Sequence, residues 1–250
     1  MWCSLSGTSI AMPFTRVTRR KFLSTAALSS AALGLPLTAQ AEEAEIFYDR
    51  ADWNMAAFDK LLRAKKSIKQ LFDTTVPDGE NLALHVHNAL TGLERGFGIS
   101  KDQILVVAAL RAGANVLNFD DYAWKKYQLG AGFHVTDPVT GKPAERNIYF
   151  ASKIAPDGKY ATDDPNDPKS MDRDWTLQGM QRRGVQLLSC HVATEGAAED
   201  AVKRLKLQVS QETVARDLLA HMLPGVISVP SMVSAIPMLE IRGHFAYLRL

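Results

Sequence analysis

One cysteine lies at the junction between a predicted strand and a predicted helix. Cys190 follows the apolar run at residues 185–189 and precedes a helical pattern that extends to residue 205. In open α/β sheets, reactive groups gather at the carboxyl ends of strands, beside the starts of the following helices. The unpaired N–H groups and the positive dipole end of a helix start favour a thiolate over a thiol. The position therefore predicts a nucleophilic sulfur; a buried, inert thiol and a thiol paired with another chain are the alternatives.

Four more residues are candidates to assist this sulfur or to bind its substrate. His191 adjoins Cys190 and would supply positive charge or a base, although neighbours along a helix point in different directions. His85, His87 and Asn88 form a polar cluster in an otherwise apolar helix pattern; one histidine is expected at the surface, and the other histidine or Asn88 is expected to border the crevice above the sheet. Arg111 directly follows another predicted strand, so it is a candidate anion-binding residue or, more simply, a surface arginine at a strand end.

Composition and motifs exclude several functional classes. The 250 residues carry 29 Lys+Arg against 27 Asp+Glu, and the net charge of +2 gives no strong field for nucleic acid or a membrane surface. No segment of the sequence approaches the roughly 20 apolar residues that span a bilayer as a helix. His85 and His87 are two residues apart and do not share a helix face, so no metal site is predicted. The sequence lacks a dinucleotide fingerprint, a phosphate-cradling loop and a Gly-x-Ser-x-Gly elbow, so no cofactor is predicted either.

Apolar patterns predict alternating strands and helices through the body of the chain. The run from Ile104 to Leu110 is continuously apolar, which is typical of a strand buried on both faces. Asp172 or Asp174 is the expected cap of one helix, and Ser210 that of a later one. Shorter strand patterns lie at 67–72, 185–189, 226–229 and 244–250, and helix patterns at 80–95, 119–129, 172–183, 190–205, 210–223 and 231–242. The alternation predicts a single three-layer α/β domain with a mostly parallel sheet of about five strands.

Residues 1–41 have the composition of an export signal. They hold four basic residues and no acidic one, and Arg19-Arg20-Lys21-Phe22-Leu23 precedes a short apolar stretch and the small residues Ala39-Gln40-Ala41. This order resembles a twin-arginine signal peptide, which is read by a translocase for folded proteins; an amphipathic N-terminal helix is the alternative. Either Met1 or Met12 could start translation, because the first eleven residues add nothing to the signal. The mature chain is therefore expected in the periplasm, with a net charge of −2 and with Cys190 as its one cysteine.

Two regions flank or interrupt the predicted domain. Residues 42–67 are charged with periodic apolar positions, and they are predicted to form an N-terminal helical extension to a domain that spans 68–250. Residues 131–170 hold five of the eleven prolines and show little periodicity. They are predicted to form an irregular insertion that covers a site or contacts a neighbouring subunit, and a disordered surface loop is the alternative.

Six short segments combine in an order that is found in one known family. They are residues 82–88 (LALHVHN), 104–110 (ILVVAAL), 184–190 (GVQLLSC), 223–226 (LPGV), 229–233 (VPSMV) and 242–248 (RGHFAYL). In this order they resemble the DsrE/DsrF-like sulfur-relay proteins with the YchN-like fold, over about residues 68–250. The resemblance implies a compact α/β layer fold that assembles into trimers or hexamers. It also implies that the cysteine matched by Cys190 holds sulfur as a persulfide and passes it between partners. The predicted export signal and the long insertion depart from the small, cytoplasmic members, so the chain resembles an exported branch of the family.

The resemblance and the position of Cys190 together predict an exported protein that handles sulfur. Cys190 would attack a sulfane sulfur donor, with Asn88, His87 or His191 supplying local polarity. One alternative is a binding or assembly subunit of an exported oxidoreductase in which Cys190 is a packed core residue. Another is an enzyme that acts on a small anionic substrate through Arg111 and a histidine. The expected partners are the Tat translocase during export, further copies of the chain and a sulfur donor or acceptor protein; neither nucleic acid nor stable membrane insertion is expected.

Overall fold

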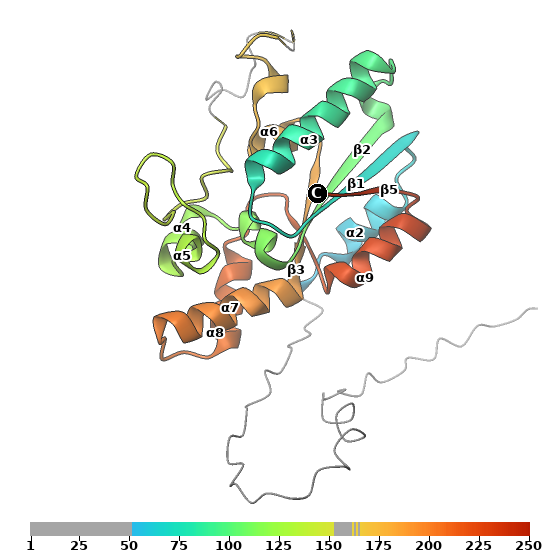
Figure 1. Ribbon diagram of the computed structural model, residues 1–250. Helices are drawn as coiled ribbons and strands as arrows, with labels where there is room; N and C mark the ends of the chain where they lie inside the picture. The colour runs from blue at the N-terminus through green and yellow to red at the C-terminus, as the bar shows by residue number, and fades with distance from the viewer. Residues whose placement is uncertain (1–51, 153–161, 163, 165) are drawn as a thin grey trace, which may run out of the picture. The chain divides into compact units, whose positions relative to one another are not determined.

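The computed structural model describes residues 52–152, 162, 164 and 166–250. The predicted signal peptide and the first ten residues of the predicted N-terminal extension lie outside the described residues. The described chain forms a three-layer α/β fold on a five-stranded, all-parallel sheet (Figure 1), which confirms the predicted fold class. The strand order is β4-β3-β2-β1-β5. The strands are Ile68–Thr74 (β1), Ile104–Leu110 (β2), Gln186–Cys190 (β3), Ile227–Val229 (β4) and Ala246–Arg249 (β5).

The direction of each connection decides which face of the sheet its helix covers. From β1 to β4 the chain moves one strand at a time in the same direction, and right-handed crossovers then place the connecting helices on one face. From β4 to β5 the chain returns across the sheet, so the same handedness places this connection on the opposite face. The first face carries α3 (Gly79–Thr91), α6 (Leu177–Arg182), α7 (His191–Leu205) and α8 (Gln211–Ala220). The opposite face carries α9 (Met232–Pro237) and the π-helix η6 (Met238–Arg242).

Each face of the sheet has its own apolar core, because alternate strand residues point to opposite faces. Along β2, Val106, Ala108 and Leu110 pack into the core that contains residues of α3 and α7. Val107 and Ala109 pack into the second core, with residues of α9. The need for apolar side chains on both faces explains why β2 is apolar throughout and why its bounds could be predicted from the sequence.

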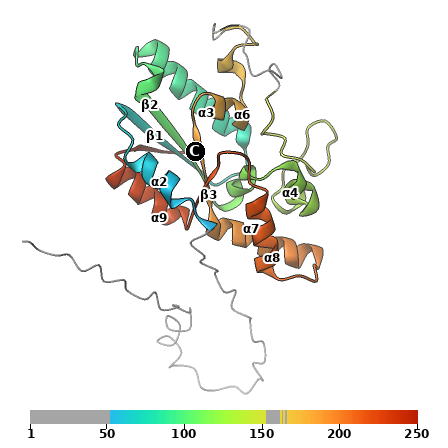
Figure 2. The ribbon, with the colours of Figure 1, turned by 180° about the vertical axis from the view of Figure 1, so that it is seen from behind.

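Helix α2 (Met55–Leu62) belongs to the second core. It forms part of the helical segment predicted within residues 42–67. Phe58, Leu61 and Leu62 are buried in the same core as α9, and Figure 2 shows α2 and α9 on the same side of the sheet. The described part of the predicted extension is therefore one of the helices that cover the sheet.

Several short helical segments complete the fold. The short segments are η2 (Gly92–Gly96), η3 (Lys101–Gln103), η4 (Ala112–Asn118), α4 (Asp121–Lys126), α5 (Leu129–Gly132) and η5 (Met171–Arg173). The single helix predicted over 119–129 is thus two helices, α4 and α5, with a break at Gln128, which has a left-handed backbone (φ 47°).

No helix within the described ranges is long and apolar enough to cross a membrane.

The described part of the predicted insertion packs against the rest of the domain. Asn147 is buried, and its side-chain amide donates to the carbonyl oxygens of Leu117 and Phe119 at 2.8 and 2.9 Å. Ala144 is buried against Gly130, where a Cβ atom would lie 2.3 Å from the Ala144 carbonyl oxygen. This part of the insertion, up to residue 152, is therefore a packed segment; residues 153–161, 163 and 165 lie outside the described residues.

The structure confirms one predicted helix cap and corrects another. Ser210 caps α8, as predicted. Thr176, and not Asp172 or Asp174, caps α6 by accepting the Gly179 N–H at 3.0 Å. The reason is that residues 171–173 form the separate 3₁₀ turn η5, so α6 starts one turn later than its sequence pattern indicates.

Candidate functional site

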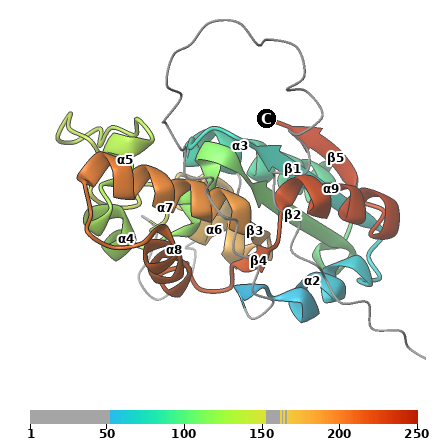
Figure 3. The same ribbon diagram turned by 90° about the horizontal axis from the view of Figure 1, so that it is seen from below.

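The candidate site lies where the chain connections change faces. Helix α7 leaves the end of β3 on one face of the sheet, and α9 leaves the end of the neighbouring β4 on the opposite face (Figure 3). In open α/β sheets, ligands bind at such a switch point, outside the carboxyl ends of the strands. β3 ends at Cys190, so the structure places the predicted cysteine at the switch point.

Cys190 joins β3 to α7 and also contacts the start of α9. It is the N-cap residue of α7, with an extended backbone (φ −91°, ψ 114°). Its Sγ accepts a hydrogen bond from the N–H of Met232, the first residue of α9, at 3.3 Å. The residue is 6% exposed and belongs to the second apolar core, with Leu188 and Val229. The sulfur therefore lies at one helix start and receives a backbone donor from another.

His191 has a different partner from its neighbour in sequence. Its Nε2 lies 3.3 Å from Oε1 of Glu195, one turn further along α7, and both side chains are buried. The Trp53 ring meets the His191 ring edge-on, with 6.3 Å between the ring centroids. The donor to the Cys190 sulfur is the Met232 N–H. The geometry therefore pairs His191 with Glu195, and a role as base for Cys190 draws no support from it.

His87 and Asn88 do not meet the sulfur. Both belong to α3, which packs into the first core, whereas Cys190 packs into the second core on the opposite face. His87 is 1% exposed, and its Nδ1 lies 2.9 Å from Nη1 of Arg183. Burial, together with the charge of Arg183, lowers the pKa of His87 to about 4, so this histidine is neutral at pH 7. Asn88 is exposed. The hypothesis that His87 or Asn88 supplies polarity at the sulfur therefore draws no support from the structure, because right-handed crossovers place α3 on the other face.

Arg111 follows β2 at the carboxyl edge, as predicted, and forms an ion pair there. Its Nε and Nη2 donate to the two carboxylate oxygens of Asp73 at 2.8 and 2.9 Å. The Tyr247 hydroxyl donates to the same carboxylate at 2.7 Å. Asp73 is fully buried, and a buried carboxylate needs such a charged partner. The hydrogen bond to Asp73 raises the pKa of the Arg111 guanidinium above its ordinary value. The pair ties β2 to β1 and β5, and this structural role accounts for Arg111 without a substrate.

Sequence reasoning missed Asn115, a fully buried residue of η4 that lies directly beside Cys190. Its side-chain Oδ1 accepts the Cys190 N–H at 2.8 Å. The short 3₁₀ segment has no clear apolar period, so no element was predicted there. The signal that could have found Asn115 is an amide among small and apolar residues directly after a buried strand.

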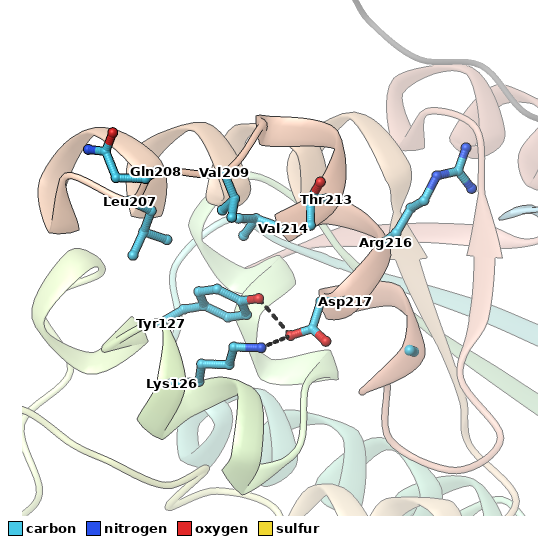
Figure 4. A pocket seen from close by; sticks show the side chains of 10 residues that line it. Lys126, Tyr127, Leu207, Gln208, Val209, Thr213, Val214, Arg216 and Asp217 are labelled. Carbon is cyan, nitrogen blue, oxygen red and sulfur yellow. Dashed lines mark hydrogen bonds and ion pairs between the residues drawn. The ribbon is translucent and has the colours of Figure 1, made fainter.

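A groove of about 530 Å³ lies between α4 and α8 (Figure 4), and Cys190 is not among the residues that line it. In it Asp217 accepts hydrogen bonds from Lys126 Nζ at 2.9 Å and from the Tyr127 hydroxyl at 2.6 Å. Burial and the hydrogen bond to Asp217 raise the pKa of Tyr127 to about 12. Hydrogen bonds to Tyr122 and Asp217 raise the pKa of Lys126. Neither Lys126 nor Tyr127 therefore exchanges a proton near pH 7, and no residue predicted from the sequence lines this groove.

No family model, curated protein or solved structure matches this chain. In the described ranges, no group of three or more His, Cys, Asp or Glu side chains could hold a metal ion. The position of Cys190 at the switch point is thus the feature of the described residues that points to a function.

Proposed function

We propose that this chain handles sulfane sulfur through a persulfide on Cys190, in the manner of the DsrE/DsrF-like proteins that it resembles. The observation that carries the proposal is the position of the sulfur. Sγ lies at the switch point of the sheet and accepts the Met232 N–H at 3.3 Å. A backbone donor at a helix start favours negative charge on a sulfur atom, and the thiolate is the form that attacks sulfur donors.

The proposed step is a sulfur transfer by nucleophilic substitution. The Cys190 thiolate attacks the outer sulfur of thiosulfate or a terminal sulfur of a polysulfide. One S–S bond forms at Sγ while the S–S bond of the donor breaks. The electron pair leaves with sulfite or with the shortened polysulfide, so no further oxidant is required. A thiolate on an acceptor protein then removes the outer sulfur by the same reaction and regenerates Cys190.

The proposal also covers where this chemistry takes place and with which partners. The order of residues 1–41 supports export by the twin-arginine route, hence a periplasmic protein that meets the Tat translocase once. The resemblance supports a trimer or hexamer and a protein that supplies or accepts sulfur. Amino-terminal sequencing of the exported protein tests the first part, and light scattering of the purified protein tests the second.

The chemistry is tested by mass spectrometry of the full chain carrying Cys3→Ser, which leaves Cys190 as the single thiol. After incubation with thiosulfate or polysulfide, the protein should gain the mass of one sulfur atom, and a reductant should remove it. Cys190→Ser in the same background should abolish the gain and leave the unfolding midpoint in urea nearly unchanged. A chain that gains no sulfur from either donor while folded contradicts the proposal.

A second candidate is favoured by burial. Cys190 is only 6% exposed and packs among aliphatic side chains, as a structural cysteine does. The chain would then be a binding or assembly subunit of an exported oxidoreductase. The rate of alkylation separates the two candidates. A sulfur-handling Cys190 reacts with iodoacetamide near neutral pH much faster than the protein unfolds, whereas a structural one reacts only at the rate of unfolding.

A further inference from the structure

We propose that Asn115 is a positioning residue that holds Cys190 in place for its reaction with a sulfur donor. This inference rests on the proposed persulfide chemistry and adds to it the group that fixes the sulfur. Asn115 belongs to η4, the 3₁₀ helix after β2, and its side chain is fully buried. Its Oδ1 accepts the Cys190 N–H at 2.8 Å and the Ser189 hydroxyl at 3.1 Å. One amide oxygen therefore holds the last two residues of β3.

The other end of the same amide reaches the carbonyl group of Cys190. Asn115 Nδ2 donates to Thr194 Oγ1 at 3.0 Å, and this hydroxyl donates to the Cys190 carbonyl oxygen at 3.2 Å. The peptide N–H of Cys190 is thus held directly, and its C=O is held through Thr194. We call Asn115, Ser189 and Thr194 the Asn115 clamp.

The clamp holds the backbone of Cys190, the residue at which α7 starts. An N-cap residue normally fixes the helix start with its own side chain, which accepts an N–H of the first turn. The Cys190 side chain makes no such bond to α7, and its sulfur accepts the Met232 N–H of α9 instead. Because the Asn115 clamp holds the backbone at the start of α7, the Cys190 sulfur is not needed as a cap for this helix. The sulfur therefore stays at the carboxyl edge of the sheet.

The clamp is also uncharged, which matters for a sulfur that must carry negative charge. Two titratable groups of the neighbouring elements have partners of their own: His191 lies against Glu195 on α7, and Arg111 pairs with Asp73 across β2 and β1. An amide holds the Cys190 N–H without adding a charge. A carboxylate at position 115 would accept the same N–H and place a negative charge beside the sulfur, which disfavours the thiolate.

The sheet offers a matched pair of hydroxyl groups for the test. Ser189 and Ser228 are register partners on β3 and β4, and both are buried. The Ser189 hydroxyl belongs to the clamp, whereas the Ser228 hydroxyl has no hydrogen-bond partner among the described residues. Ser189→Ala and Ser228→Ala therefore remove the same group at equivalent depth, with and without a bond to Asn115.

The experiment measures iodoacetamide alkylation of Cys190 as a function of pH, in the full chain carrying Cys3→Ser. Asn115→Asp should move the midpoint of the alkylation profile upward by about one pH unit, because it places a negative charge beside the sulfur, and so lower the rate at neutral pH by up to about tenfold. The near-isosteric Thr194→Val should lower that rate about threefold, because the Cys190 carbonyl group is no longer held. Ser189→Ala should lower that rate about threefold, and Ser228→Ala should leave it unchanged. Transfer of sulfur from thiosulfate should fall in the same order.

Each result decides between a positioning role and a structural one. A variant that only loosens the fold reacts faster at every pH, because opening exposes the thiol, and its midpoint does not move; that result overturns the positioning role of Asn115. Equal profiles for Ser189→Ala and Ser228→Ala overturn it as well. If the wild-type Cys190 takes up no sulfur and reacts only on unfolding, the proposed function fails together with this inference. Urea unfolding of each variant confirms that the reacting chain is folded.

Discussion

Replacement of His87 by glutamine should remove a large part of the pH dependence of stability below neutral pH. Burial lowers the pKa of His87 from its ordinary value of 6.5 to about 4 in the folded chain. Between these two values the unfolded chain binds one more proton than the folded chain, so the free energy of unfolding falls as the pH falls. The stabilisation from neutral His87 is therefore fully present above pH 6.5 and is lost as the pH falls through 4.

The size of the effect follows from this shift. Each pH unit in this window costs about 1.4 kcal/mol, so His87 alone should account for about 3 kcal/mol between pH 7 and pH 4. His87→Gln keeps a side-chain group that can accept from Arg183 Nη1, which lies 2.9 Å from Nδ1, but cannot titrate in this window. As the pH falls to 4, wild type should therefore lose about 3 kcal/mol of unfolding free energy relative to His87→Gln.

Urea unfolding at half-unit pH steps measures this difference. His85→Gln is the matched control, because His85 lies on the exposed side of the same helix and its loss changes the histidine count equally. Carboxylates titrate in all three proteins and cancel in the comparison. A difference between wild type and His87→Gln that is constant from pH 7 to pH 4 would refute the reasoning about this buried histidine.

Three further predictions concern stability, and urea unfolding at pH 7 tests each of them. Gly130→Ala should cost about 2 kcal/mol or more, because the new Cβ would lie 2.3 Å from the Ala144 carbonyl oxygen; a loss below about 0.5 kcal/mol would mean that the insertion does not pack there. Arg111→Gln should cost about 3 kcal/mol or more, since it leaves the fully buried Asp73 without its charged partner, and an unchanged midpoint would contradict the ion pair. Thr176→Ala should lower the free energy of unfolding by about 1 kcal/mol, because it removes the cap of α6; an unchanged free energy would mean that Thr176 does not act as the cap.

The architecture could be predicted from the sequence because its signals are local. A continuously apolar run of seven residues identifies β2, and its neighbours in sequence supply helix patterns with caps and glycine stops. Ser210 was identified as a cap because a hydroxyl before a helical pattern is a local signal as well. The position of Cys190 at a strand end followed from the same alternation, without knowledge of the strand order.

The partners within the site could not be predicted, because they depend on strand order and on distant contacts. Arg111 meets Asp73 only because β1 and β2 are adjacent and in the observed register, 38 residues apart in the chain. The sequence could not show that His87 lies on the opposite face from Cys190, because it does not reveal which face of the sheet α3 covers. Asn115 was missed because its bonds to Cys190 and Thr194 span more than 70 residues and leave no periodic pattern.

The inner strand β1 pairs on one side with β5, which is made last among the described strands. Asp73 on β1 receives the Tyr247 hydroxyl from β5, 174 residues later, and its carbonyl oxygen accepts the Leu250 N–H. During synthesis, β1 therefore retains an unpaired edge until β5 has been translated. Pairings this distant in sequence close slowly, and a bare strand edge can join that of another nascent chain. The newly made chain is most exposed to aggregation before its last strand docks, and chaperones would protect it most in that interval.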